Sequence, residues 1–246
     1  MISKIRRYLC SFNSKVGSRN KEVRDIWLEK RLKEINPGLR ILDAGAGQLR
    51  YKSFCNHLKY VSQDFDCYDG KGDGRGLHSE KWNQENIDMI SDITEIPEPD
   101  ESFDAIMCVE VLEHLPEPLK ALREFKRLLK KDGILLLTVP FSCLTHMSPY
   151  FYITGFSKYY FEKWLKELGF ENIGITYNGN YFEWIAQELR RLEWVSYRYT
   201  NLKAFTLKQK WALNCILKLL GGLSRSDKGS SELLSLGLFI KAEKRG

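Results

Sequence analysis

The sequence predicts an α/β protein with a doubly wound, Rossmann-like and mostly parallel sheet, and with a helical insertion before the last strand. Apolar strand-like runs alternate with amphipathic helical segments over residues 37–179, which is typical of such a sheet. The run "GILLLTVPF" is apolar throughout, as strands covered on both faces are. A chain of 246 residues can bury one substantial core, or at most two small ones.

Residues 1–36 are expected to form an N-terminal helical segment. Val23, Ile26, Trp27, Leu32 and Ile35 recur near helical spacing, and "NPG" then ends the helix.

Residues 37–179 are expected to form the α/β core. The predicted strands are "RILDA", "KYVSQDF", "DMISDI", "FDAIMCVEV", "GILLLTVPF" and "ENIGITYNG". The predicted helices are "QLRYKSFCNHL", "PEPLKALREFKRLLKKDG" and "SKYYFEKWLKELGF", and the second should end in its lysine-rich last turn and glycine. The loop "CYDGKGDGRGLHSEKWNQEN" is long enough to indicate a function.

Residues 180–230 are expected to form a helical insertion, and residues 231–246 the last strand of the sheet. "NYFEWIAQELRRLEWVSYRY" and "FTLKQKWALNCILKLLGGL" each predict a helix. Residues 196–226 contain six basic side chains and no acidic one.

The net charge of +6 conceals an asymmetry, because residues 1–40 carry +7, residues 41–118 carry −11 and residues 119–246 carry +10. An acidic middle between basic ends does not indicate a continuous nucleic-acid surface, so no nucleic-acid partner is expected. The basic N-terminus has no apolar signal-peptide core and no run approaches the ~20 apolar residues that span a bilayer, which places the chain in the cytoplasm. The six cysteines show no zinc-knuckle spacing, and no metal is expected.

The stretch "ILDAGAGQLRY" reads as a strand that leads into a ligand-binding turn. A dinucleotide fingerprint has a third glycine three places after the second, where this chain has Arg50. Asp43 at the strand end would repel a pyrophosphate, whereas it would attract a ligand that carries a sulfonium and an ammonium. S-adenosyl-L-methionine has both cations and no phosphate, so it is the expected ligand.

Several motifs in order resemble the class I S-adenosylmethionine-dependent methyltransferases, in the branch often called type 11. The resemblance covers about residues 38–175 and rests on "LDAGAG", "YVSQD", "SDITEIPEPDESFDAIMCVEVLEHL" and "LLKKDGILLLTVP". The segment "GQLR" departs from the small residue that many members have there. The resemblance implies the Rossmann-like fold, the cofactor and methyl transfer.

The resemblance also implies a set of cofactor-binding residues. The glycines of the first motif admit the methionine part, the acid of the second strand holds the ribose hydroxyls, and Asp66 is the alternative to Asp64 for that role. Asp92 also fits a local cap, since it precedes "ITE". The expected set is Asp43, Ala44, Gly45, Gly47, Asp64, Asp92, Ile93, Cys108 and Val109.

Histidines after two strands are the candidate catalytic residues. Ligands of doubly wound sheets bind at the carboxyl ends of strands, and His114 and His146 follow "FDAIMCVEV" and "GILLLTVPF". His146 is the first choice as general base for a hydroxyl acceptor, because histidine titrates near neutral pH. Tyr150 and Tyr152 precede the next helix and are expected to bind a sugar ring or planar acceptor.

The expected function is methyl transfer to a small-molecule or glycan acceptor, at a hydroxyl. "PFSCLTHMSPYFYITGFSKYYFEKW" followed by "NGNYFEWIAQELRRL" resembles methyltransferases of bacterial surface-glycan biosynthesis, which implies a lipid-linked sugar as partner. The alternatives are a methyltransferase of RNA or protein, and a protein that binds the cofactor without catalysis.

The basic stretch 196–226 has two interpretations. It could cap the acceptor pocket and touch an anionic membrane surface, as a peripheral protein on the inner membrane face would. Packing on its own domain or on a second copy is the interpretation that we favour from sequence, and the sequence leaves the oligomeric state open.

Overall fold

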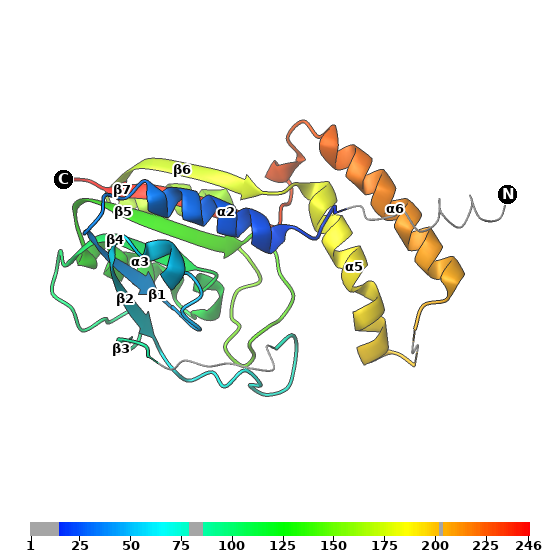
Figure 1. Ribbon diagram of the computed structural model, residues 1–246, viewed down its shortest axis with the longest axis horizontal. Coiled ribbons are helices and arrows are strands. Elements are labelled where there is room, and N and C mark those ends of the chain that lie inside the picture. The colour runs from blue at the N-terminus through cyan, green and yellow to red at the C-terminus, as the bar shows by residue number, and fades with distance from the viewer. Residues whose placement is uncertain (1–14, 79–85, 202–203) are drawn as a thin grey trace. The chain divides into compact units, whose positions relative to one another are not determined.

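The computed structural model describes residues 15–78, 86–201 and 204–246 (Figure 1). These residues form two compact units. One comprises the described residues up to Val23 together with Tyr177–Leu236, and the other comprises Arg24–Thr176 and Gly237–Gly246. The chain therefore changes unit after residues 23, 176 and 236. Residues 1–14 of the expected N-terminal segment and 79–85 of the glycine-rich loop lie outside the described residues.

The second unit carries a seven-stranded sheet in the order β3-β2-β1-β4-β5-β7-β6. Strand β1 pairs in parallel with β2 and β4, β2 with β3, and β4 with β5, whereas β7 is antiparallel to β5. The expected mostly parallel, Rossmann-like sheet is confirmed. The strands are β1 Arg40–Ala44, β2 Lys59–Asp64, β3 Met89–Ile90, β4 Phe103–Val109, β5 Leu129–Pro140, β6 Phe170–Asn178 and β7 Gly237–Lys244.

The sheet core follows from the period of two in side-chain direction along a strand. Ala105 and Met107 of β4 pack into a cluster with Leu28 and Leu32 of helix α2, Asn20–Lys33. Ile106, which lies between them and points to the opposite face, is also fully buried. Both faces of the sheet are therefore covered, which explains the continuously apolar strands.

Helix α3, Pro118–Leu128, begins with a proline in its first turn, where no backbone N–H is needed. The prediction that this helix continues to Gly133 is wrong. Leu129 adopts extended backbone geometry and pairs with Phe103, so β5 begins there. Lys130 binds the Asp104 carboxylate at 2.7 Å instead of capping a helix, so strand pairing overrides the local signal.

The predicted helix "QLRYKSFCNHL" is also wrong, since the structure has a single 3-10 turn, η1, at Lys52–Cys55. Leu49 has a φ of +56°, which a right-handed helix cannot contain. The following Tyr, Ser, Phe, Cys, Asn and His are poor helix formers. The predicted helix after β5 is confirmed as α4, Lys158–Glu167.

The first unit contains the two helices expected before the last strand, α5 Tyr181–Tyr199 and α6 Leu207–Arg225 (Figure 1). Asn180 caps α5 by accepting the Glu183 N–H, and Thr206 forms a capping box with Gln209. Val16, Ala186, Leu217 and Leu220 form the unit's apolar cluster. No helix among the described residues is long and apolar enough to cross a membrane.

Candidate functional site

A cavity of about 390 Å³ lies in the second unit, where β1, β2 and β4 end. This volume is in the range of small-molecule sites, and the carboxyl ends of parallel strands are where such sites form. Ten of the residues selected from sequence line it: Asp43, Gly45, Gly47, Asp64, Asp92, Ile93, Val109, His114, Tyr150 and Tyr152. Ala44 and Cys108 are fully buried within their strands, and His146 stands behind His114 outside the lining.

The turn after β1 requires glycine at position 45. Gly45 has a φ of +76°, and a Cβ atom there would lie 2.5 Å from Cγ2 of Val111. The N–H groups of Gly45 and Ala46 both donate to the carbonyl oxygen of Gln63 at 2.9 Å. The turn is thus fixed to the end of β2, and its backbone can approach a ligand closely.

Asp64, at the end of β2, holds the second glycine of the turn. Its Oδ2 accepts the Gly47 N–H at 2.8 Å, and its Oδ1 accepts the Asp66 N–H at 3.2 Å. Of the two candidate ribose-binding acids, Asp64 lines the cavity and Asp66 is absent from the described lining.

Asp43 is a buried acid that favours a cationic ligand. Its carboxylate accepts the Tyr60 hydroxyl at 2.6 Å, and burial raises its pKa to about 7. The hydrogen bond from Tyr60 opposes that rise, and the charge of Asp64 adds to it. A bound cation would favour the ionised carboxylate, whereas a pyrophosphate would disfavour it. The two acids and the glycine turn therefore fit S-adenosylmethionine.

Asp92 and Ile93 line the cavity from the segment between β3 and β4. The Asp92 Oδ1 accepts both the N–H and the hydroxyl of Thr94 at 2.8 Å, so it stabilises a local turn as well as facing the cavity. Ile93 is buried and presents an apolar wall.

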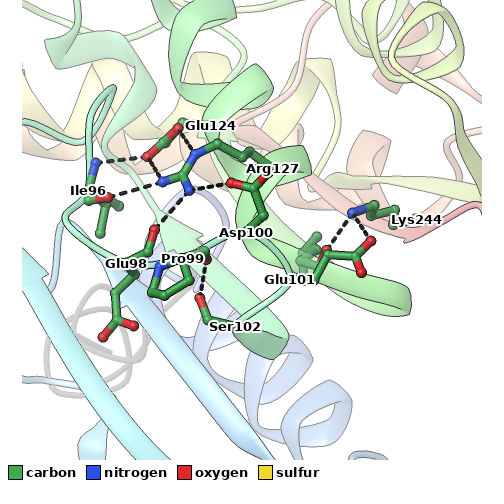
Figure 2. Close-up of polar contacts among 10 residues, drawn as sticks. Ile96, Glu98, Pro99, Asp100, Glu101, Ser102, Glu124, Arg127 and Lys244 are labelled. Carbon is green, nitrogen blue, oxygen red and sulfur yellow. Dashed lines mark hydrogen bonds and ion pairs between the residues drawn. The ribbon is translucent and has the colours of Figure 1, made fainter.

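Arg127 of α3 fixes the rest of that segment, as Figure 2 shows. Its guanidinium donates to the carbonyl oxygens of Ile96 and Glu98 and binds Asp100 at 2.8 Å. Glu124 accepts from Arg127 and also from the Ile96 N–H at 2.8 Å. This network lies outside the cavity and holds the chain that carries Asp92 and Ile93.

Glu110, which immediately follows β4, is a lining residue that the sequence analysis did not select. Its φ is +55°, its Oε2 binds Arg24 at 2.8 Å, and its Oε1 accepts the Thr138 hydroxyl at 2.9 Å. The sequence signal that could have identified Glu110 is its position directly after a parallel strand, where ligands bind in such sheets. Since both carboxylate oxygens are occupied, Glu110 contributes shape and charge balance.

His114 and His146 stand edge to face, with ring centroids 4.6 Å apart. The Nδ1 atoms of His114 and His146 lie 2.6 and 2.9 Å from the carbonyl oxygens of Tyr150 and Leu144, respectively. Burial, and then the neighbouring His146, lower the pKa of His114 to about 4, so its imidazole is neutral at pH 7.

Glu113 is a second residue that the sequence analysis missed, although it stands beside His114. Its side chain is 1% exposed, and its Oε1 lies 3.9 Å from the Nε2 of each histidine. Neither carboxylate oxygen has a hydrogen-bond partner among the described residues. Burial raises its pKa well above the ordinary value, and the carboxylate of Glu110 adds to that rise.

Aromatic rings lie near the histidines, and those of Phe65 and Tyr150 line the cavity. Tyr150 packs edge-on against Phe65 at 5.1 Å, and Phe151 lies 5.1 Å from His146. The backbone N–H groups of Tyr152 and Ile153 both donate to the Glu113 carbonyl oxygen, so the loop after β5 is tied to the end of β4. A planar or ring-shaped acceptor could stack here.

The fold and the acid–glycine cavity together define an S-adenosylmethionine-dependent methyltransferase with a class I, Rossmann-like sheet. Residues 16–192 match a family described as methyltransferase domain, and the chain belongs to that family. The predicted enzyme class and cofactor are confirmed.

Solved structures share this fold at low sequence identity. An S-adenosylmethionine-dependent methyltransferase from Archaeoglobus fulgidus superposes with a TM-score of 0.55 at 17% identity, covering 91% of this chain and 94% of that one. Phosphoethanolamine N-methyltransferase 2 from Haemonchus contortus, in complex with S-adenosyl-L-methionine, gives 0.52 at 18% identity over 91% and 53%.

Curated relatives match over shorter segments. A ubiquinone biosynthesis O-methyltransferase from Dinoroseobacter shibae is 37% identical over 108 residues, which are 43% of this chain and 43% of that protein. Another protein of the same description, from Haemophilus ducreyi, is 50% identical over 38 residues, or 15% and 16%. The chain thus matches less than half the length of these relatives.

Proposed function

We propose that this methyltransferase acts on a ring-bearing small molecule or glycan and methylates a hydroxyl group. The observation that carries the proposal is a pair of adjacent imidazoles, His114 and His146. His114 lines the candidate cofactor cavity, and His146 lies beside it next to an aromatic ring. A hydroxyl must lose its proton near the transition state, and imidazole is the side chain suited to accept it.

We assign each residue a role from its position in the structure. Asp43, Asp64 and the glycine turn would hold S-adenosylmethionine, which when bound supplies a methyl group on a good leaving group. The aromatic side chains of Phe65, Tyr150 and Phe151 would orient the acceptor ring. Such orientation can lower the activation free energy substantially in a reaction that requires the reacting atoms to be aligned. His146 would receive the hydroxyl proton, with His114 as second choice.

The acceptor class has two candidates that share this chemistry. The sequence resemblance around residues 140–164 favours a sugar hydroxyl on a lipid-linked glycan. The curated relatives named for ubiquinone biosynthesis favour instead a hydroxyl on the ring of a lipid-tailed quinone precursor. Both acceptors carry a ring, a hydroxyl and an apolar anchor, and we propose this combination as the substrate class.

The test is an assay with methyl-labelled S-adenosylmethionine and two acceptor sets, polyprenyl-linked sugars and polyprenyl-substituted catechols. Label transferred to one set, at an oxygen identified by mass spectrometry, supports the proposal and names the acceptor. Label transferred to RNA or to protein in a cell extract, with neither set modified, contradicts it.

A second proposal concerns the first unit, which we propose docks on an anionic membrane surface. Exposed apolar side chains stand four and eight residues apart along α6: Leu207 is 87% exposed, Trp211 54% and Leu219 61%. Lys208 and Lys218 lie on the same helix, and the sequence of residues 196–226 contains no Asp or Glu. Exposed tryptophan and leucine beside lysine is typical of an interfacial helix. Such docking would suit an enzyme with a lipid-anchored acceptor.

A further inference from the structure

The side chains of Glu113, His114 and His146 bring three potential metal-ligand atoms within 4.8 Å of one another. A carbonyl oxygen can only accept a hydrogen bond, so the Nδ1 atoms held by Tyr150 and Leu144 carry a proton in each ring. The Nε2 atoms are therefore the lone-pair atoms, and both lie 3.9 Å from the Glu113 Oε1. These three atoms lie close together, and neither oxygen of the buried Glu113 carboxylate has a hydrogen-bond partner among the described residues.

This arrangement is electrostatically incomplete. A buried carboxylate without a hydrogen bond is costly, and removal of its partner from a buried pair typically costs several kcal/mol. Arg24 attracts the Glu113 carboxylate, but its direct ion pair, at 2.8 Å, is with Glu110. A cation held between the Glu113 carboxylate and the two Nε2 atoms would compensate this buried charge.

We propose that Glu113, His114 and His146 form a binding site for a divalent transition-metal ion, with Zn²⁺ as its first occupant. One ligand atom from each residue lies within 4.8 Å of the others. Ligands of a tetrahedral zinc ion at about 2.1 Å stand roughly 3.4 Å apart, so the described site is slightly open and closes by side-chain rotation. The sequence prediction of no metal rested on cysteine spacing, which this set does not use.

The surroundings support ligation in detail. Metal-binding histidines generally donate the other ring N–H to a carbonyl oxygen, and both histidines do so here. Two imidazoles and one carboxylate suit Zn²⁺ or Fe²⁺, whereas Mg²⁺ prefers an all-oxygen shell. His114 lines the cavity, so an ion held by these three residues would stand beside it with a coordination position left for an acceptor oxygen.

The role of the ion rests on the proposed function, although its binding does not. A divalent ion lowers the pKa of an oxygen that it coordinates, so an acceptor hydroxyl would lose its proton more easily there. With the ion bound, the Nε2 atoms would act as its ligands, and solvent would receive the hydroxyl proton in place of His146.

The test is metal binding by tag-free protein after chelation, in the absence of S-adenosylmethionine and of any acceptor. We expect calorimetry to show one equivalent of Zn²⁺ bound, and Mg²⁺ to bind far more weakly. Co²⁺ serves as a spectroscopic probe, whose visible bands report nitrogen ligation in a low-symmetry site. Glu113→Gln and His146→Gln should each weaken Zn²⁺ binding about tenfold or more and alter the Co²⁺ bands.

The matched control is His57→Gln, because His57 bonds to the Leu32 carbonyl oxygen away from this site. Zn²⁺ affinity should not change in this variant. His146 is the informative position if Glu113→Gln fails to fold, since the His146 side chain is 26% exposed. Absence of stoichiometric Zn²⁺ binding in the wild type, or unchanged binding in His146→Gln, would overturn the proposal.

The outcomes separate this inference from the proposed function. Zn²⁺ binding that depends on these residues, in a protein that methylates neither acceptor set, would sustain the site and refute the function. Full methyl transfer by chelator-treated protein with no measurable metal would sustain the function and refute the metal's role in it.

Discussion

The Gly47 backbone N–H donates to the Asp64 carboxylate at 2.8 Å, which joins the turn after β1 to the end of β2. A single side chain thus shapes the glycine turn and presents a carboxylate to the cavity. Replacement of Asp64 by an uncharged residue therefore changes both the turn and the charge facing the ligand.

We expect Asp64→Ala to weaken S-adenosylmethionine binding by about 1–3 kcal/mol, the range for loss of a charge-assisted hydrogen bond. Isothermal titration calorimetry measures it. Asp66→Ala is the matched control, since Asp66 is absent from the described cavity lining and should leave affinity nearly unchanged. The reverse result would assign the ribose contact to Asp66.

The affinity for S-adenosylmethionine should depend on pH through Asp43. Burial raises the pKa of Asp43 to about 7, so below that pH the carboxyl is protonated in the free protein. The cationic cofactor favours the ionised form, so its affinity should fall as pH decreases, by up to about tenfold per unit. Calorimetry in buffers of different ionisation enthalpy should detect proton release on binding.

Asp43→Asn provides the control for that pH dependence. The variant should bind the cofactor more weakly and show no proton release between about pH 5.5 and 7. A wild-type affinity that is flat over this range would mean that Asp43 does not sense the cofactor's charge.

Gly45→Ala should destabilise the protein by at least about 1–2 kcal/mol, because alanine at positive φ is strained and its Cβ would overlap Val111. Thermal unfolding measures the change. Val111→Ala in the same chain should restore part of the lost stability by removing the two closest methyl groups. Gly222→Ala in α6 meets no atom within 4 Å and should not destabilise the fold. Equal losses in both glycine variants would contradict the packing argument.

His146→Ala should lower kcat about 10²-fold or more while leaving cofactor affinity intact, since a catalytic group near the acceptor need not touch the cofactor. Steady-state kinetics with an identified acceptor and calorimetry with S-adenosylmethionine make the comparison. His57→Gln should retain activity. Wild-type turnover in His146→Ala would remove this histidine from the mechanism.

The double change Lys208→Gln and Lys218→Gln should reduce sedimentation with anionic vesicles, because each lysine near such a surface contributes about 1 kcal/mol. Trp211→Ala should reduce binding through lost apolar insertion, and added salt should weaken the wild type. Lys210 is left unchanged because it pairs with Glu193 at 2.9 Å. Lys120→Gln in α3 is the control. If neither the double lysine substitution nor Trp211→Ala reduces vesicle binding, packing of this helix against another protein would be favoured instead.

Much of the cofactor site could be predicted from sequence because its parts are local. Asp43, Gly45 and Gly47 belong to one strand–turn unit, and the acid of β2 follows at the next strand end. The strands could also be predicted, because a continuous apolar run favours a buried strand whichever segments cover it. The predicted helix ends were less reliable, because Leu129 joins β5 by pairing with a distant strand.

The histidine cluster shows what local patterns cannot supply. His114 and His146 could each be selected from its place after a strand, yet their 4.6 Å ring separation depends on a loop folded back onto Glu113. Glu113 lies inside the motif that ends in "VLEHL", but nothing in its local sequence separates it from an exposed acid. Its burial, without a hydrogen-bond partner among the residues that the structure describes, follows from the tertiary structure.

The sequence by itself determined the sheet, the acid–glycine turn and hence the class of cofactor, because each depends on residues adjacent in the chain. Tertiary structure alone decided which imidazoles meet, which acid they enclose and which carboxylates are already neutralised by arginine. Burial and distance set those electrostatics, and both arise from segments that are far apart in the sequence.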